Sequence, residues 1–219
     1  MSLKVLIVDG SPEPSSPDLV ARLAGDADYV IAVDRGAAVC HSAQVIPNLF
    51  VGDEDSIDGA SAAWVHGCAG RLVKLAVEKD DTDLGVAIVC AKEEAARRGE
   101  VLDLTLTCAT GGRPDHALAV LGLLARHKAD CPVVLEDTFE MTILSPEGID
   151  SWELSGAVGE TFSALALEPG TTVSIEGMRW DLDEYELPLL SDLGVSNRVV
   201  CEDAKVWCHE GCLAAFLFR

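Results

Sequence analysis

The sequence has no apolar run long enough to cross a membrane. Its longest run, Ala117 to Ala125, is far short of the roughly 18 residues that a transmembrane helix requires. The N-terminal segment reaches Asp9-Gly10 soon after Lys4, which leaves too short an apolar region for a signal peptide. These two absences lead us to expect a cytoplasmic protein with no membrane partner.

Basic residues are also few. The chain has 16 lysines and arginines against 37 aspartates and glutamates, which gives a formal net charge of −21 and a sequence pI near 4.4. A surface of this charge repels the phosphates of nucleic acids, so we expect no nucleic-acid partner. A small phosphate ligand is not excluded, because a metal ion held by aspartates can supply the local positive charge.

Two common nucleotide-binding motifs are missing. The sequence contains neither G-x-x-x-x-G-K-[ST] nor G-x-G-x-x-G, so any nucleotide is held in another way. A zinc site at Cys208-His209-Glu210-Gly211-Cys212 lacks a second ligand pair at zinc-site spacing, and the surrounding pattern favours a hairpin that turns at Glu210-Gly211. We interpret the scattered cysteines as buried thiols.

The first 131 residues show strand patterns that alternate with helix patterns. The predicted strands are Leu3 to Val8, Val30 to Val33, Leu49 to Val51, Arg71 to Leu75 and Val101 to Cys108. Such alternation predicts a parallel sheet with helices on its faces. Hydrophobic residues make up 49% of the chain, enough for a substantial core. We therefore predict an N-terminal Rossmann-like α/β domain over residues 1–131.

The character of the sequence changes at about Pro132. Short β-type runs separated by Gly, Pro and Ser follow, and no strong helix pattern appears after His127. The runs are Val133 to Glu136, Met141 to Leu144, Thr161 to Leu167, Thr171 to Glu176, Lys205 to His209 and Cys212 to Phe218. They predict a C-terminal antiparallel β domain over residues 132–219, built as a partial barrel or, as we favour, a β-sandwich.

Carboxylates follow several predicted strands of the α/β domain. Asp34 follows one strand, and Val51-Gly52-Asp53-Glu54-Asp55 places two carboxylates two residues apart after another. Residues i and i+2 of an extended segment point the same way, and paired carboxylates suit a hard cation such as Mg²⁺. An acidic turn is the alternative interpretation. Because ligands of parallel sheets bind at the carboxyl ends of strands, these acids gather where a ligand is expected.

Two further segments contain residues suited to phosphate chemistry. Asp80 and Asp83 begin the helix that ends near Arg98, although the helix dipole alone also favours acids there. The segment Thr110-Gly111-Gly112-Arg113-Pro114-Asp115-His116 places two glycines and an arginine before a helix. Exposed backbone N–H groups and a guanidinium both favour oxyanions, so this segment is a candidate phosphate cradle.

Taken together, the motifs resemble the thiamine pyrophosphokinase family through nearly the whole chain. The matching segments, in order, are Ala32-Val33-Asp34-Arg35-Gly36-Ala37, Val51-Gly52-Asp53-Glu54-Asp55-Ser56-Ile57, Glu78-Lys79-Asp80-Asp81-Thr82-Asp83, Gly111-Gly112-Arg113-Pro114-Asp115-His116, Gly177-Met178-Arg179-Trp180-Asp181-Leu182 and Gly194-Val195-Ser196-Asn197. The predicted change from α/β to all-β falls between the fourth and the fifth.

The resemblance implies an enzyme that transfers the terminal diphosphate of ATP, as one unit, to the hydroxyethyl oxygen of thiamine, giving thiamine diphosphate and AMP. Such a transfer needs charge neutralisation and in-line positioning, which metal ions provide. By their place in the family motifs, Asp53, Asp55 and Asp83 are implied as Mg²⁺ ligands and, with Asp115, as catalytic residues. No general base is assigned, because metal-assisted deprotonation of the alcohol is an equal alternative.

The resemblance also implies two substrate sites. The implied ATP-binding residues are Asp34, Lys79, Asp80, Gly111, Gly112 and Arg113. The implied thiamine-binding residues are Trp180, which would stack on a thiamine ring, and Ser196 and Asn197, which would contact its pyrimidine edge. A packed tryptophan in a β domain is the alternative for Trp180. The family further implies a homodimer whose active sites are shared between the α/β domain of one subunit and the β domain of another.

The sequence departs from the family pattern at two positions and leaves two rival functions. Arg35 stands where the family usually has glycine, and Glu54 stands where an aromatic residue is common.

One rival function is a diphosphokinase of the same architecture that acts on another heterocyclic alcohol, such as a hydroxymethylpterin. The other is a non-catalytic sensor of thiamine or nucleotide, which would bind without turnover.

Overall fold

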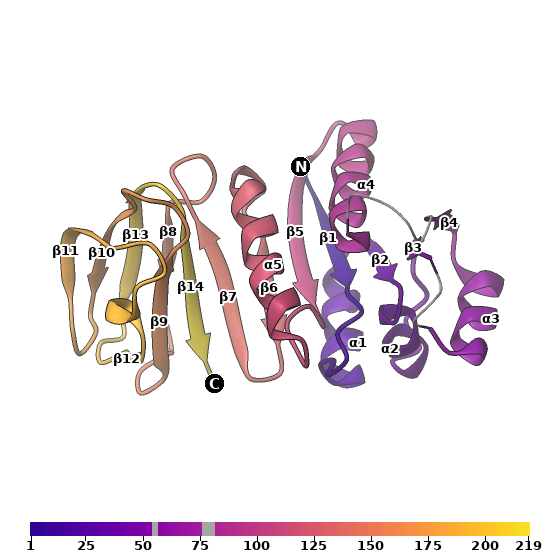
Figure 1. Cartoon of the computed structure of the whole chain (residues 1–219), viewed down its shortest axis with the longest axis horizontal. Coiled ribbons are helices and arrows are strands. Elements are labelled where there is room, and N and C mark those ends of the chain that lie inside the picture. Colours follow the sequence, from indigo (N-terminus) through magenta and orange to yellow (C-terminus); the bar gives the residue numbers. More distant parts are fainter. Residues whose placement is uncertain (54–56, 76–81) are drawn as a thin grey trace. The chain divides into compact units, whose positions relative to one another are not determined.

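The computed structural model describes residues 1–53, 57–75 and 82–219. The chain divides into two compact units (Figure 1). Unit 1 comprises Met1–Val120 and Leu135–Asp137, and unit 2 comprises Leu121–Val134 and Thr138–Arg219. Within the described ranges, no helix combines the length and the apolar character needed to span a membrane.

Parallel strands form the sheet of unit 1 in the order β5, β1, β2, β3, β4. Their bounds are β1 (Ser2–Val8), β2 (Tyr29–Val33), β3 (Leu49–Gly52), β4 (Arg71–Lys74) and β5 (Val101–Thr107). The strand β6 (Val133–Glu136) is the neighbour of β5 on its other side. The mixed α/β character and the parallel sheet that were predicted from the alternating patterns are confirmed.

Helices connect these strands (Figure 1). They are α1 (Pro17–Asp26), α2 (Gly36–Ser42), α3 (Gly59–Cys68), α4 (Asp83–Arg98) and α5 (Pro114–Arg126). The side chains of Ser16, Asp58 and Thr82 cap α1, α3 and α4 by accepting backbone N–H groups of the first turn. Gly99 ends α4 with φ 70°, a left-handed conformation that glycine adopts without strain.

The core of unit 1 lies where helices cover the central strands. In β1, the residues from Val5 to Val8 are all at most 1% exposed, as expected for a parallel strand that is covered on both faces. Leu6 and Val8 of β1 pack in one cluster with Leu19 and Val20 of α1. Because their sides are occupied in this way, the strands offer side chains to ligands only where they end.

Unit 2 consists of two antiparallel sheets. One has the strand order β12, β9, β14, β7 and the other has β11, β10, β13, β8. The bounds are β7 (Phe139–Leu144), β8 (Ser151–Glu153), β9 (Thr161–Ala166), β10 (Thr172–Glu176), β11 (Leu182–Glu186), β12 (Asn197–Arg198), β13 (Lys205–Glu210) and β14 (Leu213–Phe218). Short 3₁₀ turns occur at Lys128–Asp130 and Asp192–Gly194.

The predicted hairpin at Glu210-Gly211 is wrong. The strands on either side of this turn, β13 and β14, belong to different sheets and pair with other partners. The alternation of buried residues was detected correctly, since Val206 of β13 and Leu213 of β14 belong to one core cluster. However, alternation is the same for two strands that pair in one sheet and for two strands that face each other across a core.

Candidate active site

The carboxyl ends of β1, β2 and β3 bring three aspartates to one edge of the unit 1 sheet. These strands pair in parallel register, β1 with β2 and β2 with β3, almost to their last residues. Asp9 and Asp34 directly follow β1 and β2, and Asp53 directly follows β3. The structure therefore brings the predicted Asp34 and Asp53 together, with Asp9 beside them.

Asp34 directly contacts the start of the Asp53 segment. One carboxylate oxygen of Asp34 accepts the backbone N–H of Asp53 at 3.1 Å. A Cβ atom on Gly52 would lie 2.0 Å from the same oxygen, so only glycine leaves room for this carboxylate. Asp34 itself has φ 42°, an uncommon left-handed conformation for a residue with a side chain. The helix α2 begins at Gly36, two residues after Asp34.

Asp9 is a site residue that the sequence analysis did not assign. Burial raises the pKa of its carboxyl to about 7, against the lowering effect of a hydrogen bond from the Gly10 N–H, and the nearby carboxylates of Asp34, Asp83 and Glu136 raise it further. The signal in the sequence was an acid at the end of a central strand. The mutual repulsion of these acids shows that negative charge is concentrated at this edge of the sheet.

Of the predicted Mg²⁺ ligands, Asp53 and Asp83 lie in the described chain. Asp83 is the first residue of α4, where the Thr82 side chain accepts the N–H of Gly85 at 3.1 Å. Asp55, Lys79 and Asp80 lie outside the described residues. Within the described residues, no three His, Cys, Asp or Glu side chains converge as a metal site, so the predicted trio remains a prediction.

The predicted phosphate cradle lies between β5 and α5. Gly112 has φ 76°, and a Cβ atom on Gly111 would come within 2.0 Å of the carbonyl oxygen of Glu13. The Ser11 hydroxyl donates to the Gly111 carbonyl at 2.6 Å. The segment that follows β1 therefore packs directly against the two glycines, and both glycines are required by the backbone geometry.

Arg113 and Asp115 form an ion pair with each other. The guanidinium donates from Nε to Oδ1 at 2.9 Å and from its Nη2 to Oδ2 at 2.7 Å. This pairing holds the pKa of Asp115 well below its usual range. Both side chains are more than half exposed, so the Arg113 guanidinium is accessible to an anion.

In unit 2, Asn197 holds the backbone on both sides of Trp180. Its amide nitrogen donates to the Trp180 carbonyl at 2.7 Å, while its amide oxygen accepts the Trp180 N–H at 3.1 Å and the Arg198 N–H at 2.8 Å. The Trp180 side chain is 56% exposed, and the Arg179 guanidinium lies 4.8 Å from its ring centre. The predicted thiamine residues Trp180 and Asn197 are therefore brought into contact.

Ser196 precedes Asn197 in a left-handed conformation with φ 62°. Its backbone N–H donates to the Ser163 hydroxyl of β9 at 3.0 Å. Ser196 is exposed, whereas Asn197 is buried. The Ser196 side chain is thus displayed at the surface next to the Trp180 segment.

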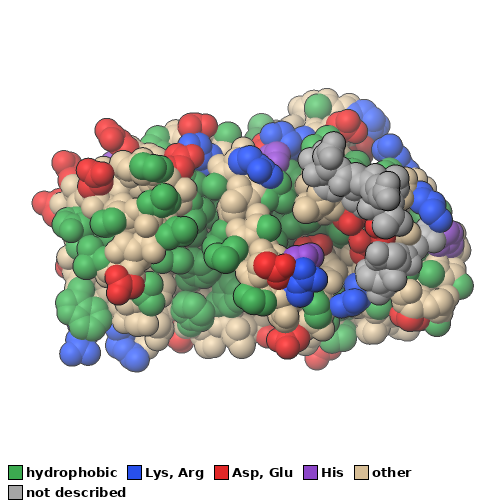
Figure 2. All heavy atoms as spheres, in the orientation of Figure 1, with side chains coloured by type: hydrophobic (Ala, Val, Ile, Leu, Met, Phe, Trp, Pro, Cys, Tyr) green, Lys and Arg blue, Asp and Glu red, His purple; other side chains and the backbone are tan. Residues whose placement is uncertain are grey.

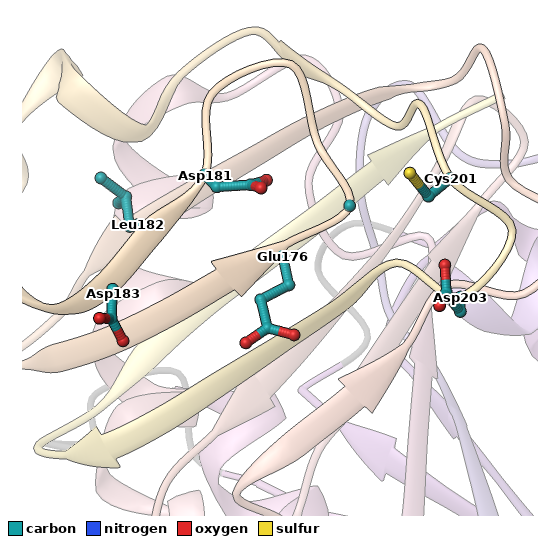
Figure 3. A pocket seen from close by; sticks show the side chains of 7 residues that line it. Glu176, Asp181, Leu182, Asp183, Cys201 and Asp203 are labelled. Atoms are coloured by element: carbon teal, nitrogen blue, oxygen red, sulfur yellow. The ribbon is translucent and has the colours of Figure 1, made fainter.

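A hollow of about 630 Å³ lies between β10, β11 and the segment before β13 (Figure 3). Its lining residues are Glu176, Gly177, Asp181, Leu182, Asp183, Cys201 and Asp203. Asp181 and Cys201 point toward each other across it (Figure 3). The lining is acidic, and the predicted thiamine residues are not part of it.

Comparisons with known proteins place most of the chain in one family. Residues 20–135 match the family model described as "Thiamin pyrophosphokinase, catalytic domain", and residues 151–213 match "Thiamin pyrophosphokinase, vitamin B1 binding domain". A thiamine pyrophosphokinase of Bacillus subtilis is 26% identical over 197 residues, which cover 89% of this chain and 88% of that protein.

Solved structures show the same fold. The crystal structure of thiamine pyrophosphokinase from Bacillus subtilis has a TM-score of 0.80 at 22% identity, with 100% of this chain and 99% of that chain covered. A thiamin pyrophosphokinase family protein from Enterococcus faecalis has a TM-score of 0.79 at 24% identity, with 99% of each chain covered. The resemblance deduced from the six sequence segments is confirmed, and the chain belongs to the thiamin pyrophosphokinase family.

Proposed function

We propose that this chain transfers the diphosphate group of ATP to thiamine and releases thiamine diphosphate and AMP. The observation that carries the proposal is the match of one chain, in order, to both family models, over residues 20–135 and 151–213. The aspartates at the strand ends of unit 1 support it, because they could hold a metal ion that would neutralise the negative charge of the transferred diphosphate.

The proposed Mg²⁺ ligands are Asp53, Asp55 and Asp83. Bound Mg²⁺ would neutralise the charge of the phosphate oxygens during transfer. Asp34 would orient the Asp53 segment through its hydrogen bond to the Asp53 N–H. Its strained backbone supports such a role, since left-handed residues with side chains concentrate at functional sites.

The proposed ATP contacts are Lys79, Asp80, Asp34, the backbone of Gly111 and Gly112, and the Arg113 guanidinium. The Arg113–Asp115 pair fixes the guanidinium through two of its donors and leaves others for phosphate oxygens. Asp115 would thus act by positioning Arg113 beside the reacting phosphates. The hydrogen bonds from Arg113 lower the pKa of Asp115, which favours the ionised form that this pairing requires.

Thiamine would bind at Trp180, Ser196 and Asn197. One face of the Trp180 ring has the Arg179 guanidinium at 4.8 Å, and the ring as a whole is 56% exposed. A cationic thiamine ring would stack on the indole and would compete with Arg179 for the same electrostatic attraction. Asn197 supports the stack by holding the Trp180 backbone at both its N–H and its carbonyl.

The proposed domain roles follow from these sites. The α/β domain, residues 1–131, would bind ATP and Mg²⁺, and the β-sandwich domain, residues 132–219, would bind thiamine. We further propose that the protein acts in the cytoplasm as a homodimer with active sites shared between subunits. Unit 2 exposes large hydrophobic side chains (Figure 2), and Leu189, Leu190, Leu193 and Val195 are each 46–56% exposed.

This apolar segment lies at a sheet edge that a second copy could cover. Gly194 packs against the Ala164 carbonyl of β9, so the segment sits on the strand next to the short edge strand β12. Several exposed large apolar side chains in one short segment that leads to Asn197 are unusual on a surface that faces water alone. We propose that a second copy of this chain covers this apolar segment in the homodimer.

One assay tests the proposed reaction directly. Purified protein is incubated with ATP, thiamine and Mg²⁺, and AMP and thiamine diphosphate are quantified over time. Steady release of both products in equal amounts is expected. Release of AMP with a hydroxymethylpterin but not with thiamine would assign the chain to another diphosphokinase, and binding of thiamine without turnover would assign it to a sensor.

A further inference from the structure

The Glu136 carboxylate gathers four donors at the edge of unit 1. Its Oε2 accepts the Cys108 N–H at 3.0 Å and the Ser15 hydroxyl at 2.5 Å. Its Oε1 accepts the Ala109 N–H at 2.8 Å and the Thr110 hydroxyl at 3.2 Å. Glu136 belongs to β6 and lies 26 to 28 residues away from the Cys108 to Thr110 segment in sequence. It therefore connects three segments that the chain order keeps apart.

The contacts resemble those of a bound anion. Successive backbone N–H groups around a left-handed residue form a concave anion site, and Cys108 has φ 57°. Here the Cys108 and Ala109 N–H groups point at a carboxylate of the protein itself. The anion-binding position nearest the end of β5 is thus filled by Glu136, and the first exposed residue after it is Gly112.

The Glu136 carboxylate also holds the Ser11 to Ser15 segment, which packs against Gly111 and Gly112. Ser15 lies in the segment after β1, and the Ser11 hydroxyl of that segment donates to the Gly111 carbonyl at 2.6 Å. The Ser11 N–H also donates to the Cys108 carbonyl at 3.0 Å. Glu136 therefore fixes the diglycine turn from two directions, through Thr110 along the chain and through the Ser11 to Ser15 segment beside it.

We propose that Glu136 is a positioning residue for ATP, which sets the diglycine turn and Arg113 in the geometry that receives the phosphates. This inference rests on the proposed function of Gly111, Gly112 and Arg113 in ATP binding. Glu136 would act through these residues, because both of its own oxygens are occupied by protein donors.

Replacement of Glu136 should change ATP affinity in the direction opposite to the one that charge repulsion alone predicts. Removing one negative charge close to bound ATP should strengthen ATP binding if charge repulsion were the only effect. Glu136→Gln keeps the shape of the side chain but turns an NH₂ group toward N–H or O–H donors. The turn would shift to relieve this conflict, and ATP binding would weaken.

The experiment compares Glu136→Gln with the wild-type protein and with Glu93→Gln, an exposed residue of α4 whose replacement removes the same charge. We expect kcat/KM for ATP to fall about 10- to 100-fold in Glu136→Gln, since misplacement of a substrate-binding group by about 1 Å can cost 100-fold. KM for thiamine should stay within about twofold of the wild-type value, a selectivity that general loss of structure would not produce. An unchanged or lower KM for ATP would overturn the proposal.

Amide hydrogen exchange tests the anchoring separately from the reaction. In Glu136→Gln, exchange of the peptide covering residues 105–113 should accelerate, while exchange in β9 and β14 should not change. Wild-type protein that releases no AMP would refute the proposed function and leave the exchange result to decide the anchoring. If the wild-type protein is active and residues 105–113 exchange equally fast in the wild type and in Glu136→Gln, the anchoring alone is refuted. If Glu136→Gln does not fold, Thr110→Val, which removes one of the four donors, should show the same changes at smaller size.

Discussion

Asp53 and Asp83 provide two of the carboxylates proposed to hold Mg²⁺, and isosteric replacement tests each of them. Asp53→Asn or Asp83→Asn should lower kcat by on the order of 10²-fold or more, because a charge-stabilising group is lost while the shape is kept. Steady-state AMP release at several Mg²⁺ concentrations measures the effect. Asp103→Asn, at an exposed position in β5, is the control. Near-normal turnover of either variant at moderate Mg²⁺ would contradict the metal assignment.

Asp9 makes the stability of the protein depend on pH. Its folded-state pKa of about 7 lies above the ordinary value of 3.8, chiefly through burial and then through Asp34, Asp83 and Glu136. Between about pH 4 and pH 7 the folded state therefore binds the proton that the unfolded state has released. The contribution of protonated Asp9 to the free energy of unfolding is fully present below pH 4 and is lost as the pH rises through 7.

Asp9→Asn should remove this dependence. Without divalent cations, the variant should melt at a higher temperature than the wild type at pH 7.5, and the two should converge near pH 4. A domain of this size gains about 2–4 °C in melting temperature for each kcal/mol. Thermal unfolding followed by circular dichroism at both pH values gives the result. An equal difference at both pH values would show that Asp9 acts by packing and not by charge.

The turn at Gly211 is the element that sends the chain from one sheet of unit 2 to the other. Gly211 has φ 79°, and a Cβ atom there would lie 2.4 Å from the Thr171 hydroxyl oxygen. Gly211→Ala should lower the free energy of unfolding by about 1–3 kcal/mol, since strain and steric conflict add. Urea unfolding measures it. Gly25→Ala in α1, where a Cβ atom meets nothing within 4 Å, should instead be neutral or stabilising.

The sequence predicts most helices and strands of this fold because their signals are local. Continuous apolar runs marked the buried strands of unit 1, and capping residues such as Ser16 and Thr82 precede its helices. The short strands β8, β11 and β12 were not predicted. The residues of β11 are mostly exposed and polar, and a strand of this kind depends on its neighbour for pairing.

The site could be predicted only where its residues lie in contiguous motifs. Asp34, Asp53 and Asp83 stand in short segments that the sequence displays directly. Glu136 stands in an ordinary β-type run, and its importance comes from hydrogen bonds to residues far away in the chain. The Arg113–Asp115 pair was missed for a different reason, since Arg113 had been assigned to ATP and Asp115 to the catalytic residues, as two separate roles.

At the scale of the whole molecule, the exposed leucines of unit 2 test the proposed dimer. Leu190→Asp combined with Leu193→Asp, at side chains that are 56% and 55% exposed, should convert a dimer into monomers and lower activity if the sites are shared. Sedimentation equilibrium and the AMP assay report the two effects. Val101→Asp, at a 73% exposed position in unit 1, is the matched control. A wild-type monomer with full activity would rule out a shared site.

The left-handed backbone at Asp34 limits how far this protein can be stabilised by engineering. Glycine adopts this conformation without the steric cost that a residue with a side chain has there. Here that replacement would delete the carboxylate that accepts the Asp53 N–H. A library screened for thermal tolerance alone should therefore recover Asp34→Gly among its stable members, and a library screened for both tolerance and turnover should exclude it.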